Sequence, residues 1–327
     1  MKRNINILVG LLAIQIALFF YLNIAEEDKG APASDPLLTL EWNKVDKITV
    51  EDSDKKTMEI VKKEGKWILP SFFDFPVNED KIRETLETLA SIKKTWPVGN
   101  TTVAAKQFEV VDDKFERRIS YHAGDSVQTL YLGTSPGYRK VHTRANKEDH
   151  TYSIDFNAFD VPANAKDWLD REVYKLDRSK LSLVQLPHIV LKQDAGNFVI
   201  ADLKEGETTN TTESDALINK VMNPRFDEVL ASGQYDHGPQ VYEYSATTSE
   251  NVTRTFTFSE MKGDAKPNKE PTKEKEKKER PIDQSLVLKV SDLPYYFSIN
   301  KNFVEGLKET DRAKFVKAEE KQEEKKS

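Results

Sequence analysis

The chain of 327 residues contains no cysteine, and this absence narrows its chemistry. Disulfides, thiol nucleophiles and thiolate metal ligands are all excluded. Lipoprotein attachment is excluded as well, because that modification acylates a cysteine. An exported protein of this composition must therefore be held together by the burial of apolar side chains.

An excess of basic residues is also lacking. The chain has 49 Lys and Arg and 55 Asp and Glu, which gives a net charge of −6. Nucleic-acid binding needs a positive patch or stripe, so nucleic acid is not an expected partner. Basic and acidic residues are interleaved along most of the chain, which is typical of a well-solvated surface. The 38% hydrophobic content suffices for one or two cores of ordinary size.

A glycine-rich phosphate-binding loop is absent too, because the 13 glycines stand singly along the chain. His142 and His150 fall on neighbouring predicted strands and leave a two-histidine metal site open beside ordinary strand surface. Asp112 and Asp113 likewise leave a carboxylate-dependent hydrolase open. We expect no cofactor, no metal and no catalytic residue, and hence a protein that is not an enzyme.

One long apolar run is present, at residues 5–22 (INILVGLLAIQIALFFYL). Its length is near the lower limit of about 17 residues for a spanning helix, and no small-x-small cleavage site directly follows. Lys2 and Arg3 precede it, which predicts a cytoplasmic N-terminus. We therefore predict a single-pass anchor over residues 1–24 in the bacterial inner membrane, with the bulk of the chain periplasmic. A cleaved signal peptide is the alternative.

The remainder predicts an α+β fold with mainly antiparallel sheets. Residues 25–39 are rich in Pro, Ala and Ser and indicate a linker. The clearest helix is 78–94, with Asn78 as cap and an apolar stripe that includes Ile82 and Leu89. Alternating patterns predict strands at 46–52, 57–64, 66–69, 117–123, 127–133, 139–145 and 150–155.

The second half of the chain repeats this pattern at an offset of about 141 to 146 residues. The most similar pair is TYSIDFNAF (151–159) and YFSINKNFV (296–304), and the helix 78–94 corresponds to 212–230, which Pro224 breaks. We therefore predict two similar repeats, at 40–178 and 179–316. A highly charged insertion at 262–281 is expected to be disordered, and a charged tail follows at 317–327.

Trp42, Trp67, Trp96 and Trp168 all fall in the first predicted repeat. All four tryptophans are expected in its core. Phe72, Phe73 and Phe75 lie in a short loop between two prolines. They either fill the core, which we favour, or form an exposed contact patch, and they are the candidate partner-contact residues.

Several of these segments together resemble a known bacterial family of domain-of-unknown-function proteins. They are VDKITVE, GKWIL, FPVNEDKIRETLETLASIKK and the run from VQTLYLG to HTYSID, followed by AKDWLDREVYKLDRSKLSLVQL. Family members join such repeats to an N-terminal transmembrane helix and are often encoded beside gliding-motility-type ABC transporters. One departure is Phe108-Glu109-Val110, where members often have Phe-Gly-Leu, so this turn is expected to be built differently.

The resemblance implies a membrane-anchored binding or accessory protein of an ABC-transporter-linked envelope complex. Its expected partners are the inner membrane, through residues 5–22, and an ABC transporter permease or another envelope protein. A structural envelope protein that binds polysaccharide or cell wall is the alternative, and a periplasmic carboxylate-dependent hydrolase is a further one.

Overall fold

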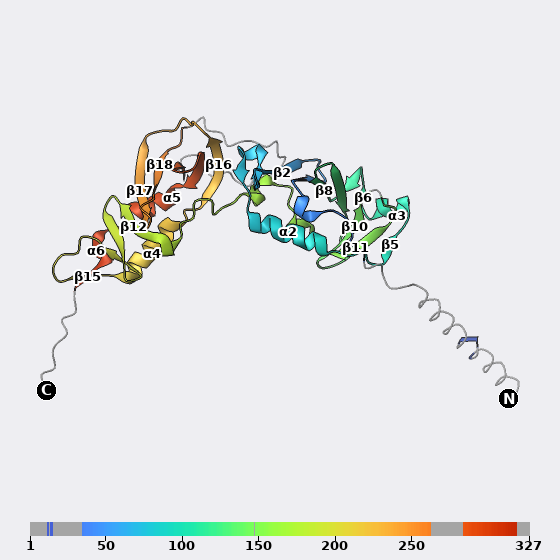
Figure 1. Ribbon diagram of the computed structural model, residues 1–327, viewed down its shortest axis with the longest axis horizontal. Coiled ribbons are helices and arrows are strands. Elements are labelled where there is room, and N and C mark those ends of the chain that lie inside the picture. The colour runs from blue at the N-terminus through green and yellow to red at the C-terminus, as the bar shows by residue number, and fades with distance from the viewer. Residues whose placement is uncertain (1–11, 13, 16–34, 147, 263–283, 319–327) are drawn as a thin grey trace. The chain divides into compact units, whose positions relative to one another are not determined.

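Two units make up the chain in the computed structural model, which describes residues 12, 14–15, 35–146, 148–262 and 284–318 (Figure 1). The first unit is assigned Met1–Glu64 and Asp80–Asn164, and the second Gly65–Glu79 and Ala165–Ser327. Both are built of antiparallel sheet with a few helices, which confirms the predicted α+β class. The segment Gly65–Glu79 belongs to the second unit although it lies early in the chain.

In the first unit the strands follow the order β2-β1-β8-β9-β10-β11-β5, and β6 pairs with β7 beside them. Its elements are η1 (Trp42–Lys44), β1 (Lys47–Asp52), β2 (Thr57–Lys63), α2 (Glu79–Ser91), β5 (Pro97–Gly99), α3 (Thr102–Gln107), β6 (Val110–Val111), β7 (Lys114–Phe115), β8 (Arg117–Ala123), β9 (Ser126–Leu132), β10 (Lys140–Ala145), β11 (Thr151–Asp155) and η3 (Ala158–Asp160). The strands predicted in this unit are confirmed to within one residue at each end.

The core of the first unit follows from strict alternation along its central strands. Ile48 on β1 lies opposite Ile60 on β2 and Tyr121 on β8, and Val50 lies opposite Ile119. All five side chains are buried, with at most 1% of their surface exposed. Because side chains of a strand alternate between faces, this register places one apolar face of β1, β2 and β8 inward.

Helix α2 confirms the clearest predicted helix but ends three residues early, at Ser91. Ile82, Thr85 and Leu89 form its buried face, at the i, i+3, i+7 spacing of a helix. The chain beyond its end is held by the start of the unit instead: Leu37 N–H donates to the Ile92 carbonyl at 2.9 Å. This pairing explains why the helix does not continue to residue 94.

The segment that precedes the first strand is packed into the same unit. Lys94 N–H donates to the Asp35 carbonyl at 2.9 Å, and Pro36 bridges to Lys93. Leu37 and Leu38 are 2% and 3% exposed. The end of the predicted linker is thus fixed to the first unit from residue 35 onward.

In the second unit the main sheet has the order β14-β13-β12-β17-β18-β19-β20-β16, and β15 pairs with β21. Its elements are β3 (Lys66–Leu69), η2 (Pro70–Phe72), β4 (Phe75–Pro76), η4 (Ala165–Trp168), η5 (Arg178–Lys180), β12 (Leu181–Leu186), β13 (Ile189–Asp194), β14 (Asn197–Ile200), β15 (Glu207–Thr209), α4 (Thr211–Met222), β16 (Phe226–Ser232), β17 (Gln240–Thr248), β18 (Thr253–Glu260), β19 (Ser285–Val290), β20 (Tyr295–Asn300), α5 (Lys301–Lys308), α6 (Arg312–Phe315) and β21 (Val316–Ala318). The break that Pro224 was expected to make in 212–230 is confirmed, since α4 ends at Met222, but the residues after it form β16, which begins two residues after Pro224.

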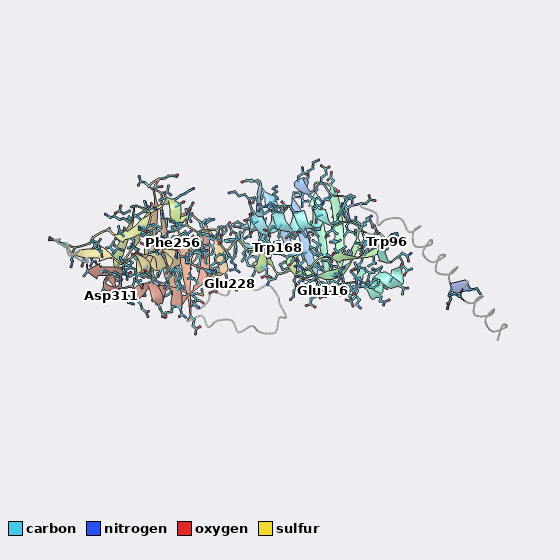
Figure 2. The ribbon with its side chains drawn as sticks, turned by 90° about the horizontal axis from the view of Figure 1, so that it is seen from below. Trp96, Glu116, Trp168, Glu228, Phe256 and Asp311 are labelled. Atoms are coloured by element: carbon cyan, nitrogen blue, oxygen red, sulfur yellow. The ribbon has the colours of Figure 1, made fainter. Side chains whose placement is uncertain are left out.

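The core of the second unit is rich in aromatic rings. Tyr244 on β17 stacks on Phe256 on β18 with ring centroids 4.7 Å apart, and Phe256 lies within the unit in Figure 2. The Tyr174 phenol donates to the Pro224 carbonyl, and burial raises its pKa. Buried tyrosines are tolerated in a core when the hydroxyl finds a partner, as these do: Tyr244 donates to the Val221 carbonyl at 2.8 Å.

Three predicted segments lie wholly or largely outside the described residues. They are the anchor run 5–22, apart from residues 12 and 14–15, the insertion 262–281 beyond Lys262, and the tail after residue 318. Within the part of the chain that is described, no helix is long and apolar enough to cross a membrane. The first residues of the predicted tail, Lys317 and Ala318, lie in β21.

Candidate functional site

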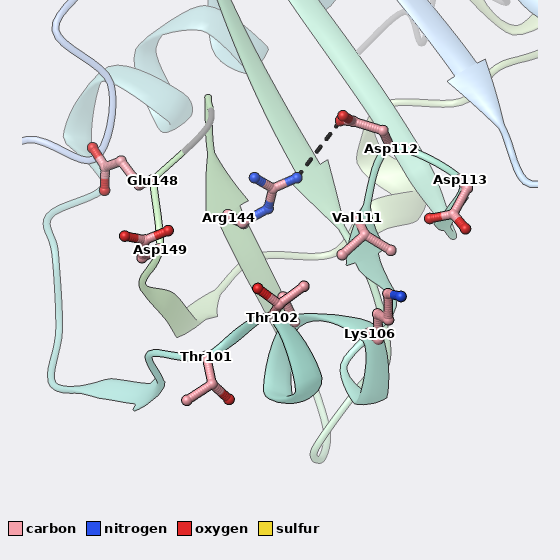
Figure 3. A pocket seen from close by; sticks show the side chains of 10 residues that line it. Thr101, Thr102, Lys106, Val111, Asp112, Asp113, Arg144, Glu148 and Asp149 are labelled. Carbon is pink, nitrogen blue, oxygen red and sulfur yellow. Dashed lines mark ion pairs between the residues drawn. The ribbon is translucent and has the colours of Figure 1, made fainter.

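A polar pocket opens on the first unit between helix α3, the β6–β7 turn and the end of β10 (Figure 3). Its volume is about 270 Å³, close to the lower end of small-molecule sites. Four carboxylates, a guanidinium, an ammonium and two hydroxyls line it. These side chains are Asp112, Asp113, Glu148, Asp149, Arg144, Lys106, Thr101 and Thr102, with Ala105 and Val111 beside them.

Arg144 is the best-fixed side chain of the pocket. It extends from β10, is only 11% exposed, and points toward Asp112 at an N–O distance of 3.7 Å (Figure 3). Its Nε donates to the Val110 carbonyl at 2.5 Å, and its guanidinium carbon lies 4.6 Å from the ring centroid of Tyr131. Stacking and hydrogen bonding together hold the planar cation in one orientation.

Asp112 is held from a second side by Tyr131. The phenol of Tyr131 on β9 donates to Asp112 Oδ1 at 2.5 Å. Burial, together with this hydrogen bond, raises the pKa of Tyr131, so the phenol keeps its proton and remains a donor. Arg144, Asp112 and Tyr131 therefore form one hydrogen-bonded group at the pocket wall.

The opposite wall is fixed by an ion pair. Lys94, just after α2, places its Nζ 3.0 Å from Glu148 Oε1. This hydrogen bond raises the pKa of Lys94 and keeps the ammonium charged. In Figure 3, Glu148 and Asp149 lie across the pocket from Asp112, so carboxylates face the cavity from both sides of Arg144.

A small apolar cluster supports the pocket from beneath. Ala105, Val110, Phe115 and Tyr131 are buried together, and Phe108 packs against them. The backbone at Phe108 is hydrogen-bonded to the segment that follows β9, because the Thr134 N–H donates to the Phe108 carbonyl at 3.0 Å. The pocket thus rests on packed residues of α3, β6, β7 and β9 rather than on loops alone.

These groups suit a small polar ligand. Carboxylates and threonine hydroxyls accept or share hydrogen bonds with hydroxyl and amine groups, as sugars and amino sugars present them. The most rigid member, Arg144, already directs its donors to Val110 and Asp112. Arg144 and Asp112 are thus engaged with each other and with the pocket wall.

Each of the two histidines that the sequence left as a metal site has a different partner in the structure. His142 on β10 shares a hydrogen bond of 2.8 Å with the Thr134 hydroxyl and packs against the ring of Phe108. His150 stacks on Tyr152 instead. Among the described residues, no group of three or more side chains could hold a metal ion.

The phenylalanine loop belongs mostly to the core of the second unit. Phe75 is fully buried, with ring centroids of Phe226, Tyr295 and Phe297 at 5.8, 4.8 and 5.9 Å. Phe72 is 3% exposed, and only Phe73 reaches the surface, at 37%. Of the three candidate contact residues, Phe73 alone is accessible to a partner.

The four tryptophans differ in how far they are buried. Trp67 and Trp168 are buried, at 7% and 0% exposed, as expected for core residues. Trp42 is half-buried and packs edge-on against Tyr121. Trp96 is 48% exposed, so the prediction of a core position is wrong for this residue. It immediately precedes β5, which among the described strands pairs with β11 alone and lies at the edge of the sheet.

Sequence reasoning missed Arg144, Tyr131 and Glu148. Of the pocket residues, the sequence points only to Asp112 and Asp113, as a possible acid–base pair. The pocket joins residues 101–113 to 144–149, and no motif links those segments. The one available signal is the cluster of acids directly after the strand that ends at Ala145.

Comparison with known family models shows which family the chain belongs to. A family model described as "Domain of unknown function (DUF4340)" matches residues 67–240, more than half of the sequence. The protein belongs to this family, which confirms the resemblance to a family of unknown function. No curated protein and no solved structure matches it.

Proposed function

We propose that this protein is a membrane-anchored periplasmic binding and accessory protein of an ABC-transporter-linked envelope complex. The observation that carries the proposal is the apolar run 5–22 ahead of the two folded units. A retained helix there, with Lys2 and Arg3 on the cytoplasmic side, would hold both units outside the cytoplasm. The ABC-transporter association rests on the resemblance to the family.

We infer further that the two units are copies of one ancestral module. The order β2-β1-β8-β9-β10-β11-β5 has a strand-for-strand counterpart in β13-β12-β17-β18-β19-β20-β16. In both, one helix, α2 or α4, precedes the edge strand, β5 or β16. In both, that edge strand pairs antiparallel with the last strand of the meander, β11 or β20. Two modules in tandem provide two surfaces for partners.

Co-purification tests the proposed complex. The full chain, tagged at its C-terminus, is extracted from membranes with a mild detergent, and co-eluting proteins are identified. We expect the permease and ATPase subunits of an ABC transporter. As a control, residues 5–22 are replaced by an unrelated spanning sequence, which keeps the membrane attachment but removes contacts specific to this helix. Elution of the protein without transporter subunits contradicts the proposed complex.

A second candidate, binding of cell-wall polysaccharide, is favoured by the pocket around Arg144. Its carboxylates and hydroxyls match the hydroxyl and amine groups of amino sugars. Sedimentation of the full chain with purified peptidoglycan tests it. Asp149→Asn should weaken binding about tenfold, the value of one charge-assisted hydrogen bond. Asp125→Asn, in an exposed turn away from the pocket, serves as the control. If the two variants bind peptidoglycan equally well, the pocket around Arg144 is not the binding site.

A further inference from the structure

An apolar edge is exposed on the first unit where β5 meets α3. Trp96 and Val98 are 48% and 44% exposed, and their spacing of two residues puts them on the same face of the chain. Val103, in the first turn of α3, is 75% exposed. Trp96 lies at the surface of the unit in Figure 2. We call Trp96, Val98 and Val103 the Trp96 edge.

The helix and strand of this edge are held closely together. A Cβ built on Gly99 would lie 2.6 Å from the Cβ of Ala104, so β5 and α3 touch at this point. The Thr101 side chain caps α3 by accepting a hydrogen bond from the Ala104 N–H at 3.1 Å. The exposed side chains are therefore carried by a fixed backbone and are not tips of a loose loop.

The Trp96 edge lies next to the point where the chain enters the unit. Asp35 and Leu37 are hydrogen-bonded to Lys94 and Ile92, two to four residues before Trp96. Thirteen peptide steps separate Asp35 from Leu22, the last residue of the apolar run. At the reach of an extended chain they span at most roughly 45 Å. An anchor at 5–22 thus keeps this edge of the first unit within reach of the bilayer.

We propose that the Trp96 edge inserts into the lipid–water interface of the membrane that holds the anchor, which rests on the anchor of the proposed function. Tryptophan favours this interface because its ring is apolar and its N–H finds a polar partner among the headgroups. Val98 and Val103 add apolar surface beside it. The contact would set the first unit directly on the bilayer.

The charges around the edge select the kind of lipid. The acids of the neighbouring pocket are accompanied by Lys106 and Arg144, and Lys93 and Lys94 closely precede Trp96, so the charges near the edge are balanced and favour no charged lipid. A zwitterionic headgroup suits these neighbours better. The contact is accordingly apolar in origin and should persist at high salt, which screens charge–charge attraction.

Quenching of tryptophan fluorescence by brominated lipid tests the proposal. The full chain is reconstituted into phosphatidylcholine vesicles with plain or brominated acyl chains, and flotation establishes that it is in the membrane. The apolar run contains no tryptophan, and Trp96 is one of four in the chain. We expect brominated lipid to remove up to a quarter of the fluorescence, and Trp96→Phe to abolish this loss. Trp42→Phe, at a half-buried site, should retain it.

The outcomes separate the two proposals. A floating chain whose Trp96 is quenched, equally at low and high salt, supports the contact. A floating chain without Trp96-dependent quenching keeps the anchor and overturns the contact. Quenching that is lost at high salt also overturns it, because the contact would then be electrostatic. A chain that does not float overturns both.

Discussion

At the scale of single residues, the most constrained position is Gly133, directly after β9. A Cβ at this position would lie 1.9 Å from the Phe108 carbonyl oxygen and 2.6 Å from that of Glu109. Both neighbours are backbone atoms and cannot rotate away. The Leu-Gly that carried part of the family resemblance therefore has a steric reason: two backbone segments cross here.

We predict that Gly133→Ala lowers the free energy of unfolding by about 2–3 kcal/mol, through overpacking. Gly137→Ala is the control, because a Cβ added there would meet no atom within 4 Å and its φ is not positive. Urea unfolding of the full chain measures both. Equal stability of the two variants would contradict the close approach of the Gly133 backbone to the Phe108 carbonyl.

Glu109 lies at the position where the family resemblance leads us to expect glycine, and its φ is +58°. This left-handed conformation is open to glycine at no steric cost and disfavours other residues. The turn at Glu109 thus has a conformation that glycine would adopt without steric cost. We predict that Glu109→Gly is more stable than Glu109→Ala by about 1 kcal/mol. Both variants lose the ion pair with Lys114, so their difference in urea unfolding isolates the backbone.

Glu207 gives a pH-dependent prediction. Hydrogen bonds from the Arg312 side chain and the Lys204 N–H lower its pKa from 4.5 to about 2. The depressed value means that its contribution to stability is present above pH 4.5 and is lost as the pH falls to about 2. The urea midpoint of Glu207→Gln should therefore lie below that of the wild type at pH 7, and the gap should close toward pH 2. A difference in urea midpoint that does not change with pH would contradict the ion pair between Glu207 and Arg312. Glu205→Gln, at an exposed neighbour, is the control.

At the scale of elements, the loop around Phe75 tests whether the phenylalanines serve folding or partners. We predict that Phe75→Ala lowers the free energy of unfolding by about 3–5 kcal/mol, because the ring is fully buried among three other aromatic rings. Phe73→Ala should cost under about 1 kcal/mol, since that ring is partly exposed. Thermal unfolding of both variants is the measurement. Comparable losses would contradict the placement of Phe75 in the core and Phe73 at the surface.

The elements of the first unit could be predicted well because their patterns are local. Alternation along Ile48 and Val50 already determines which face of β1 is inward. Where the sequence failed, a distant contact decided the outcome. The end of α2 depends on Leu37, more than fifty residues earlier, and β16 follows Pro224 because it pairs with β20. Propensity alone does not register such pairings.

The candidate site was predictable only in part, for the same reason. Asp112 stood out as an acid in a turn, but its partners Tyr131 and Arg144 lie on β9 and β10. Trp96 was expected in the core because tryptophan is usually buried, yet it precedes an edge strand that pairs on one side only. Neither arrangement has a sequence motif.

At the scale of the whole molecule, the central claim is that both units lie outside the cytoplasm on a retained anchor. The absence of native cysteine makes this directly measurable, since one introduced thiol reports one site. Ser53 in the first unit and Ser249 in the second are exposed and suit a change to cysteine. We predict that Ser53→Cys and Ser249→Cys, each in the full chain, react with a membrane-impermeant maleimide in intact bacterial spheroplasts and sediment with the membranes. Labelling only after permeabilisation, or recovery of the chain in the soluble fraction, would contradict the account.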